Sequence, residues 1–129
     1  MEKESKNKKK VVIVEDDKLL AIVLKKMANS LDYEVLDITK TGKDAVASVK
    51  KHKPDLIFMD IVLEDDTSGI DAMKMIREYS DAPVIYITGL EDVSVRKQAA
   101  GVPNSFYMLK PVNIAELKMA MHNSDLFAA

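Results

Sequence analysis

The chain has 129 residues, 47% of them hydrophobic and 31% charged, which suits one globular domain and leaves no room for a second. It contains no cysteine, which excludes disulfides, thiolate metal sites and a thiol nucleophile, and we expect a cytoplasmic location. The net charge is −2. Residues 1–10 hold five of the 19 Lys and Arg but only two of the 21 Asp and Glu, so the rest of the chain is acidic. An acidic domain is unsuited to binding nucleic acid through its phosphates.

Residues 1–8 are rich in lysine, and we expect them to form a disordered tail ahead of the folded part. The apolar run that follows this tail is too short for a signal peptide or a membrane span, so no contact with a membrane is expected. We place the folded domain at residues 9–124 and a short C-terminal tail at residues 125–129.

The first half of the chain predicts two strands, each followed by a helix. An unbroken apolar run at residues 11–14 is typical of a parallel strand covered on both faces. Apolar residues then recur at helical spacing over residues 20–31. Residues 33–38 mix polar and apolar side chains, as a strand at a sheet edge does, and a second helical pattern follows at residues 45–49.

The second half of the chain continues the alternation. Three further strands covered on both faces are predicted from apolar runs at residues 56–59, 84–87 and 106–109. Clear helical patterns cover residues 70–76 and 114–121. Residues 91–100 carry only a thin apolar stripe and predict a weaker helix, which Gly101 ends.

Five strands alternating with five helices predict right-handed βαβ units, and therefore an α/β fold with a doubly wound parallel sheet. In an open sheet of this kind, ligands bind beyond the carboxyl ends of the strands. The residues that directly follow the strands are therefore the candidate site.

Three acids, a hydroxyl group and an ammonium group follow the strands at this edge. They are Glu15 and Asp16 after the first strand, Asp60 after the third, Thr88 at the end of the fourth and Lys110 after the fifth. Neighbouring carboxylates repel one another unless a cation neutralises them, and Mg²⁺ prefers carboxylate and phosphate oxygens. A carboxylate is also a nucleophile toward phosphorus, while lysine and threonine stabilise the oxygens of a transferred phosphoryl group. The pattern therefore predicts a magnesium-dependent phosphoryl acceptor.

Five motifs together make the chain resemble the receiver domains of two-component response regulators over residues 9–124. They are "VVIVEDD", "PDLIFMDIVL", "SGIDAM", "PVIYITG" and "FYMLKP". The resemblance implies a flavodoxin-like (βα)5 fold with five parallel strands in the order 2-1-3-4-5. It also implies that the domain promotes only its own phosphorylation and dephosphorylation, and is not an enzyme acting on other substrates.

Carried to this sequence, the resemblance implies a role for each candidate residue. Asp60 would accept a phosphoryl group from a histidine kinase or a histidine phosphotransfer protein. Asp16 directly, and Glu15 through water, would hold Mg²⁺ together with Asp60 and the backbone carbonyl of Val62. Lys110 would pair with the phosphoryl group.

The resemblance also implies a switch. The hydroxyl of Thr88 would bind the phosphoryl group, and the ring of Tyr107 would turn inward as Thr88 moves. The face formed by the helix at 91–100, the strand at 106–109 and the last helix would then change its affinity for a downstream protein of unknown identity, or support a homodimer. The Lys110–Pro111 peptide bond is expected to be cis.

The loop after Asp60 departs from the family pattern. Many receivers have a proline there, whereas "VLEDDTSGI" has none and is one residue longer than the commonest form. Three acids in this loop are Glu64, Asp65 and Asp66. We expect them to alter recognition by the kinase or to make the segment mobile.

Three other assignments stay open. We expect a single-domain, stand-alone regulator, and a receiver excised from a larger regulator or hybrid kinase is the alternative. An aspartyl-phosphate hydrolase of the haloacid dehalogenase type is disfavoured, because Val62 stands where that class has a second aspartate as general acid. A degenerate receiver used only as a binding scaffold is disfavoured by the complete set of acids, hydroxyl and lysine.

Overall fold

The computed structural model describes residues 8–128, with side chains through Ser124. One parallel sheet contains five strands in the order β2-β1-β3-β4-β5, which confirms the predicted flavodoxin-like α/β fold. The strands are β1 (Lys9–Val14), β2 (Tyr33–Thr39), β3 (Leu56–Met59), β4 (Val84–Thr88) and β5 (Ser105–Leu109). The helices are α2 (Lys18–Ser30), α3 (Gly42–His52), α4 (Gly69–Ile76), α5 (Val93–Ala100) and α6 (Ile114–Ala128).

Apart from Lys8, the tail expected at residues 1–8 lies outside the described residues. Helix α6 continues to Ala128 and so passes through most of the segment expected as a C-terminal tail. Within the described part of the chain, no helix combines the length and apolar character needed to cross a membrane.

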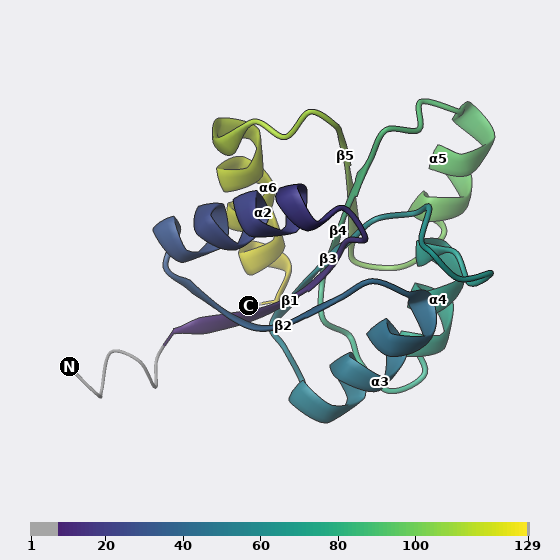
Figure 1. The fold of residues 1–129 in the computed structure, drawn as a ribbon, viewed down its shortest axis with the longest axis horizontal. Helices are drawn as coiled ribbons and strands as arrows, with labels where there is room; N and C mark the ends of the chain where they lie inside the picture. Colours follow the sequence, from purple (N-terminus) through teal and green to yellow (C-terminus); the bar gives the residue numbers. More distant parts are fainter. Residues whose placement is uncertain (1–7, 129) are drawn as a thin grey trace.

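Helices cover both faces of the sheet and form two hydrophobic cores. Figure 1 shows α2 and α6 on one face and α3, α4 and α5 on the other. Leu24 and Leu117 pack with the β1 and β3 side chains that point to the first face. Val49 and Met73 pack with the β1, β3 and β4 side chains that point to the second. Because successive strand residues point to opposite faces, both faces must be apolar, which explains the unbroken apolar runs.

The two edge strands are the least regular. The pairing of β2 with β1 shifts register between Val11 and Val12, so β2 carries a bulge. The prediction that β5 is covered on both faces is only partly right, because Met108 is its one buried residue. The reason is that β5 lies at an edge, and α5 beside it buries only Ala99.

A polar side chain caps the start of each helix. The carboxylate of Asp17 accepts hydrogen bonds from the amides of Leu19 and Leu20 and so caps α2. Thr41, Ser68, Asp92 and Asn113 cap α3, α4, α5 and α6. These caps fix the residue at which each helix begins, close to the carboxyl ends of the strands, where the candidate site lies.

Gly69 allows α4 to pack directly against the backbone of Asp60. A Cβ atom at this position would overlap the carbonyl oxygen of Asp60, whereas one on Gly89 would meet nothing within 4 Å. We expect Gly69→Ala to lower the free energy of unfolding by about 3 kcal/mol, since this overlap outweighs the gain in helix propensity. Gly89→Ala should change it by less than about 1 kcal/mol. Urea denaturation of both variants checks this, and equal stabilities would contradict the close packing.

Candidate functional site

The acids predicted from the strand ends lie together. In the parallel pairing of β1 with β3, Val14 lies opposite Met59, so Glu15 and Asp60 leave the sheet side by side. The amide of Asp60 donates a 3.0 Å hydrogen bond to the carbonyl of Val14. One carboxylate oxygen from each of Glu15, Asp16 and Asp60 lies within 4.8 Å of the others. The strand register therefore brings three carboxylates into one cluster, which we call the acid cluster.

Lys110 approaches this cluster from the end of β5. Its Nζ atom lies 3.0 Å from Oδ2 of Asp60, where it donates a hydrogen bond, and 3.1 Å from Oε1 of Glu15. Burial alone would lower the pKa of Lys110, but the hydrogen bond to Asp60 and the charges of both acids raise it above its ordinary value. Lys110 is therefore an ammonium ion at neutral pH. Its peptide bond to Pro111 is cis, as predicted.

One ammonium group does not neutralise three carboxylates. Burial and the neighbouring charge of Asp60 raise the pKa of Glu15 to about 7, against the lowering effect of the hydrogen bond from the Asp17 amide. Oε1 of Glu15 forms an ion pair with Lys110, and among the described residues this buried oxygen has no other partner. Carboxylate oxygens with spare capacity are ligands that Mg²⁺ prefers. The residues present therefore fit a divalent cation.

Thr88 and Tyr107 are linked through one residue of the β4–α5 loop. Thr88 is buried at the end of β4, and its Oγ1 accepts a 3.3 Å hydrogen bond from the amide of Leu90. The hydroxyl of Tyr107 donates a 2.7 Å hydrogen bond to the carbonyl of the same Leu90. Burial raises the pKa of Tyr107, so the phenol stays protonated and able to donate. A movement of Leu90 would therefore change the hydrogen bonds of both side chains.

Sequence reasoning missed two partners of Tyr107. The guanidinium of Arg96 lies 4.9 Å from the centre of the Tyr107 ring, a cation–π contact. Tyr86 is the second partner, with its ring centre 6.4 Å from that of Tyr107. The parallel register places Tyr86 next to Tyr107 on neighbouring strands, which a sequence reading could have found. Nothing local in the sequence indicates that Arg96 of α5 points at the ring.

The loop after Asp60 is fixed on both sides of Val62. Ile61 and Leu63 are 4% and 8% exposed and pack into the core beneath α3 and α4, whereas the Val62 side chain is 59% exposed. This alternation orients the intervening backbone, whose carbonyl is the fourth expected ligand of the cation.

A family model for the response regulator receiver domain matches residues 11–122, which include every candidate residue above. The chain belongs to this family.

Relatives and solved structures agree with this assignment. The transcriptional regulatory protein YvrH of Bacillus subtilis (strain 168) is 31% identical over 107 residues, which are 83% of this chain and 45% of YvrH. The transcriptional regulatory protein PdtaR of Mycobacterium tuberculosis is 30% identical over 109 residues, 84% of this chain and 53% of PdtaR. The signal receiver domain of a putative LuxO repressor from Vibrio parahaemolyticus is 28% identical with a TM-score of 0.84, covering 94% and 92% of the two chains. The receiver thus spans about half the length of the two regulatory proteins.

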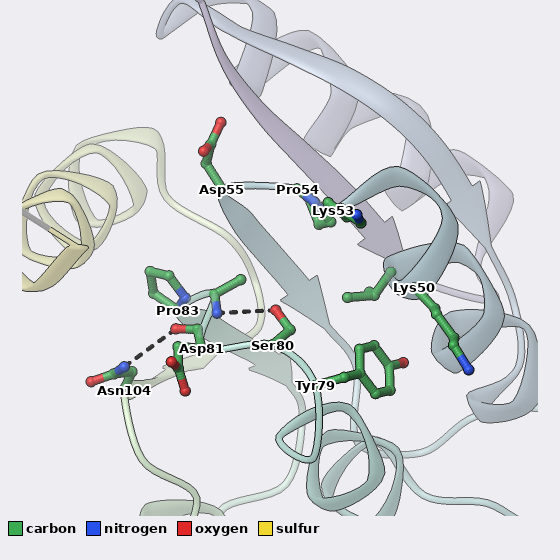
Figure 2. A pocket seen from close by; sticks show the side chains of 11 residues that line it. Lys50, Lys53, Pro54, Asp55, Tyr79, Ser80, Asp81, Pro83 and Asn104 are labelled. Carbon is green, nitrogen blue, oxygen red and sulfur yellow. Dashed lines mark hydrogen bonds between the residues drawn. The ribbon is translucent and has the colours of Figure 1, made fainter.

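The receiver also has a cavity of about 600 Å³ at the amino ends of the strands, the end of the sheet opposite the acid cluster (Figure 2). Its lining comes from the end of α3 and from the segments that enter β3 and β4, including Lys50, Tyr79 and Asp81. None of the candidate residues lines it. Because ligands of doubly wound sheets bind at the carboxyl ends of the strands, the acid cluster remains the candidate site.

Proposed function

We propose that this receiver accepts a phosphoryl group on Asp60, in a Mg²⁺-dependent reaction, from a histidine kinase or a histidine phosphotransfer protein. The observation that carries the proposal is the buried Asp60 carboxylate, 3.0 Å from the Lys110 ammonium and within 4.8 Å of ligand oxygens of Glu15 and Asp16. Membership of the receiver family supports it, because phosphoryl acceptance is the family's activity.

Asp16, Asp60, Glu15 and the carbonyl of Val62 are the groups that would hold Mg²⁺. When bound, the ion supplies positive charge that offsets the repulsion between the acids and the incoming phosphoryl oxygens. The chain's own contribution is to gather these ligands at one point. The β1–β3 register brings Glu15 and Asp60 together, and burial of the residues that flank Val62 would orient its carbonyl toward the ion.

Asp60 is the nucleophile in the proposed transfer. A carboxylate oxygen attacks phosphorus, a new O–P bond forms, and the leaving group departs with the electron pair of its former bond to phosphorus. Lys110 already lies against Asp60 and would pair with the oxygens of the transferred group. Thr88, at the end of the neighbouring strand, would donate its hydroxyl to the same group.

The output would pass through Leu90. A hydroxyl of Thr88 engaged by the phosphoryl group no longer holds the Leu90 amide in the same way, and the Tyr107 hydroxyl is bonded to the Leu90 carbonyl. We therefore assign the α5–β5–α6 face as the surface that changes its affinity for a downstream protein or for a second copy of the chain.

Labelling with a small phosphodonor tests the function. We expect stoichiometric, Mg²⁺-dependent labelling of the protein and no repeated turnover of a phosphatase substrate. Repeated turnover would favour a hydrolase of the haloacid dehalogenase type. Absence of any label would favour a binding scaffold. Either result would contradict the proposal.

The raised pKa of Glu15 makes Mg²⁺ binding sensitive to pH. Because the cation needs the ionised carboxylate, protons compete with it below a pKa of about 7, and affinity falls as the pH falls. We expect the affinity to drop by nearly tenfold between about pH 8 and about pH 6 in calorimetric titrations. Glu15→Gln should bind Mg²⁺ more weakly and without this dependence. An affinity in the wild type that is independent of pH would contradict the assignment.

A further inference from the structure

The loop between β3 and α4 carries two of the groups assigned to the cation, Asp60 and the carbonyl of Val62. It contains no proline that would restrict its backbone, so its conformation depends on contacts with the rest of the domain. Ile61 and Leu63 anchor its first part in the core. The second part, from Glu64 onward, is acidic and lies at the surface.

Asp65 ties this second part to the start of α3. Its Oδ1 atom accepts a 2.9 Å hydrogen bond from the amide of Gly42, and its Oδ2 atom a 3.1 Å hydrogen bond from the amide of Lys43. The pKa of Asp65 is lowered, above all by the hydrogen bond from Gly42, so the group is ionised at neutral pH. A negative charge at the amino end of a helix is stabilised by the aligned peptide dipoles.

This contact completes the cap of α3. Thr41, the capping residue directly before α3, accepts a hydrogen bond from the amide of Asp44. The two amides before it are those that Asp65 occupies. The first turn of α3 therefore has its donors satisfied by two different segments, one of them 23 residues away in the sequence.

The loop and α3 pack so closely that there is no room for a side chain at position 42, the first residue of the helix. A Cβ atom on Gly42 would lie 2.7 Å from both Cβ and Cγ2 of Thr67, the residue two positions after Asp65. The loop and the helix start are thus joined by two independent features, a bidentate carboxylate and a glycine that admits Thr67.

We propose that Asp65 is a positioning residue that raises the affinity of the site for Mg²⁺ by holding the loop against α3. Asp65 does not belong to the group of acids that could hold the ion. Its effect is indirect: because Ile61 and Leu63 hold the first part of the loop in the core and Asp65 holds the second part on α3, Mg²⁺ binding need not order the backbone around Val62. This inference rests on the proposed function, since it assumes that the acid cluster binds Mg²⁺.

Three variants separate this role from the alternatives. Asp65→Ala removes the anchor. Asp66→Ala removes the same charge from an exposed neighbour in the same loop. Thr41→Ala weakens the cap of α3 but leaves the loop anchored. Asp65→Asn, which keeps one acceptor oxygen, guards against a variant that fails to fold.

Mg²⁺ binding to each purified variant is measured directly by calorimetry, and phosphodonor labelling is measured as a function of Mg²⁺ concentration. We expect Asp65→Ala to need roughly tenfold more Mg²⁺ for half-saturation, with the labelling rate at saturating Mg²⁺ unchanged. Asp65→Asn should show a smaller shift. Asp66→Ala and Thr41→Ala should stay within roughly twofold of the wild type.

A purely structural role for Asp65 would lower the stability of Asp65→Ala and Thr41→Ala alike without moving half-saturation, and that result would overturn the inference. Equal shifts in Asp65→Ala and Asp66→Ala would overturn it as well, because charge alone would then explain them. Failure of the proposed function looks different: a wild type that binds Mg²⁺ but takes no label would contradict phosphorylation, while the calorimetric comparison would still decide the role of Asp65.

Discussion

Asp60→Asn is expected to remove phosphorylation altogether, by at least about a hundredfold in labelling rate. The amide has almost the same shape as the carboxylate, but its oxygen is a poor nucleophile toward phosphorus. The protein should still fold, because the substitution removes the repulsion between Asp60 and the buried Glu15, and Lys110 keeps Glu15 as a partner. Incorporation of label and the circular dichroism spectrum are measured on the same sample.

The matched control for this variant is Asp66→Asn, which makes the same change at an exposed position in the same loop. It should be labelled like the wild type. Label that survives in Asp60→Asn would move the acceptor to another residue, and loss of label in both variants would point to a general effect of loop charge.

Asp16→Ala and Asp17→Ala are expected to differ sharply although the residues are adjacent. Asp16 contributes an oxygen to the acid cluster, whereas the side chain of Asp17 caps α2. Removing Asp16 should weaken Mg²⁺ binding by at least about a hundredfold, since losing an outer-shell partner alone costs up to that much. Phosphorylation at ordinary Mg²⁺ concentrations should then be abolished.

Asp17→Ala should leave the dependence on Mg²⁺ intact. It should lower the free energy of unfolding by about 1 kcal/mol, the usual loss when a capping aspartate is removed. Labelling against Mg²⁺ concentration and urea denaturation together separate the two variants. Similar labelling of Asp16→Ala and the wild type would remove Asp16 from the metal site.

The fold and the position of the acid cluster were within reach of the sequence. Unbroken apolar runs identify parallel strands, and parallel strands bring the residues after them to one edge, so the proximity of Glu15, Asp60 and Lys110 follows from topology. The burial of β5 was overestimated, because an apolar run does not show whether a strand lies at the edge of the sheet.

The sequence could not predict individual side-chain contacts between different elements. Asp65 appeared in the sequence only as one of three loop acids, and neither its own pattern nor that of Gly42 indicates that the two meet. The position of Arg96 over the ring of Tyr107 depends likewise on how α5 is rotated against β5. Such contacts depend on the placement of whole elements, which short-range periodicity does not specify.

The most direct test of the central claim is to locate the phosphoryl group. The protein is treated with a small phosphodonor with and without Mg²⁺, reduced with borohydride, which converts an aspartyl phosphate to homoserine, and sequenced by tandem mass spectrometry. We predict homoserine at position 60, formed only when Mg²⁺ is present. Aspartate retained at position 60 in a labelled protein, or homoserine at another position, would contradict the assignment of Asp60 as the acceptor.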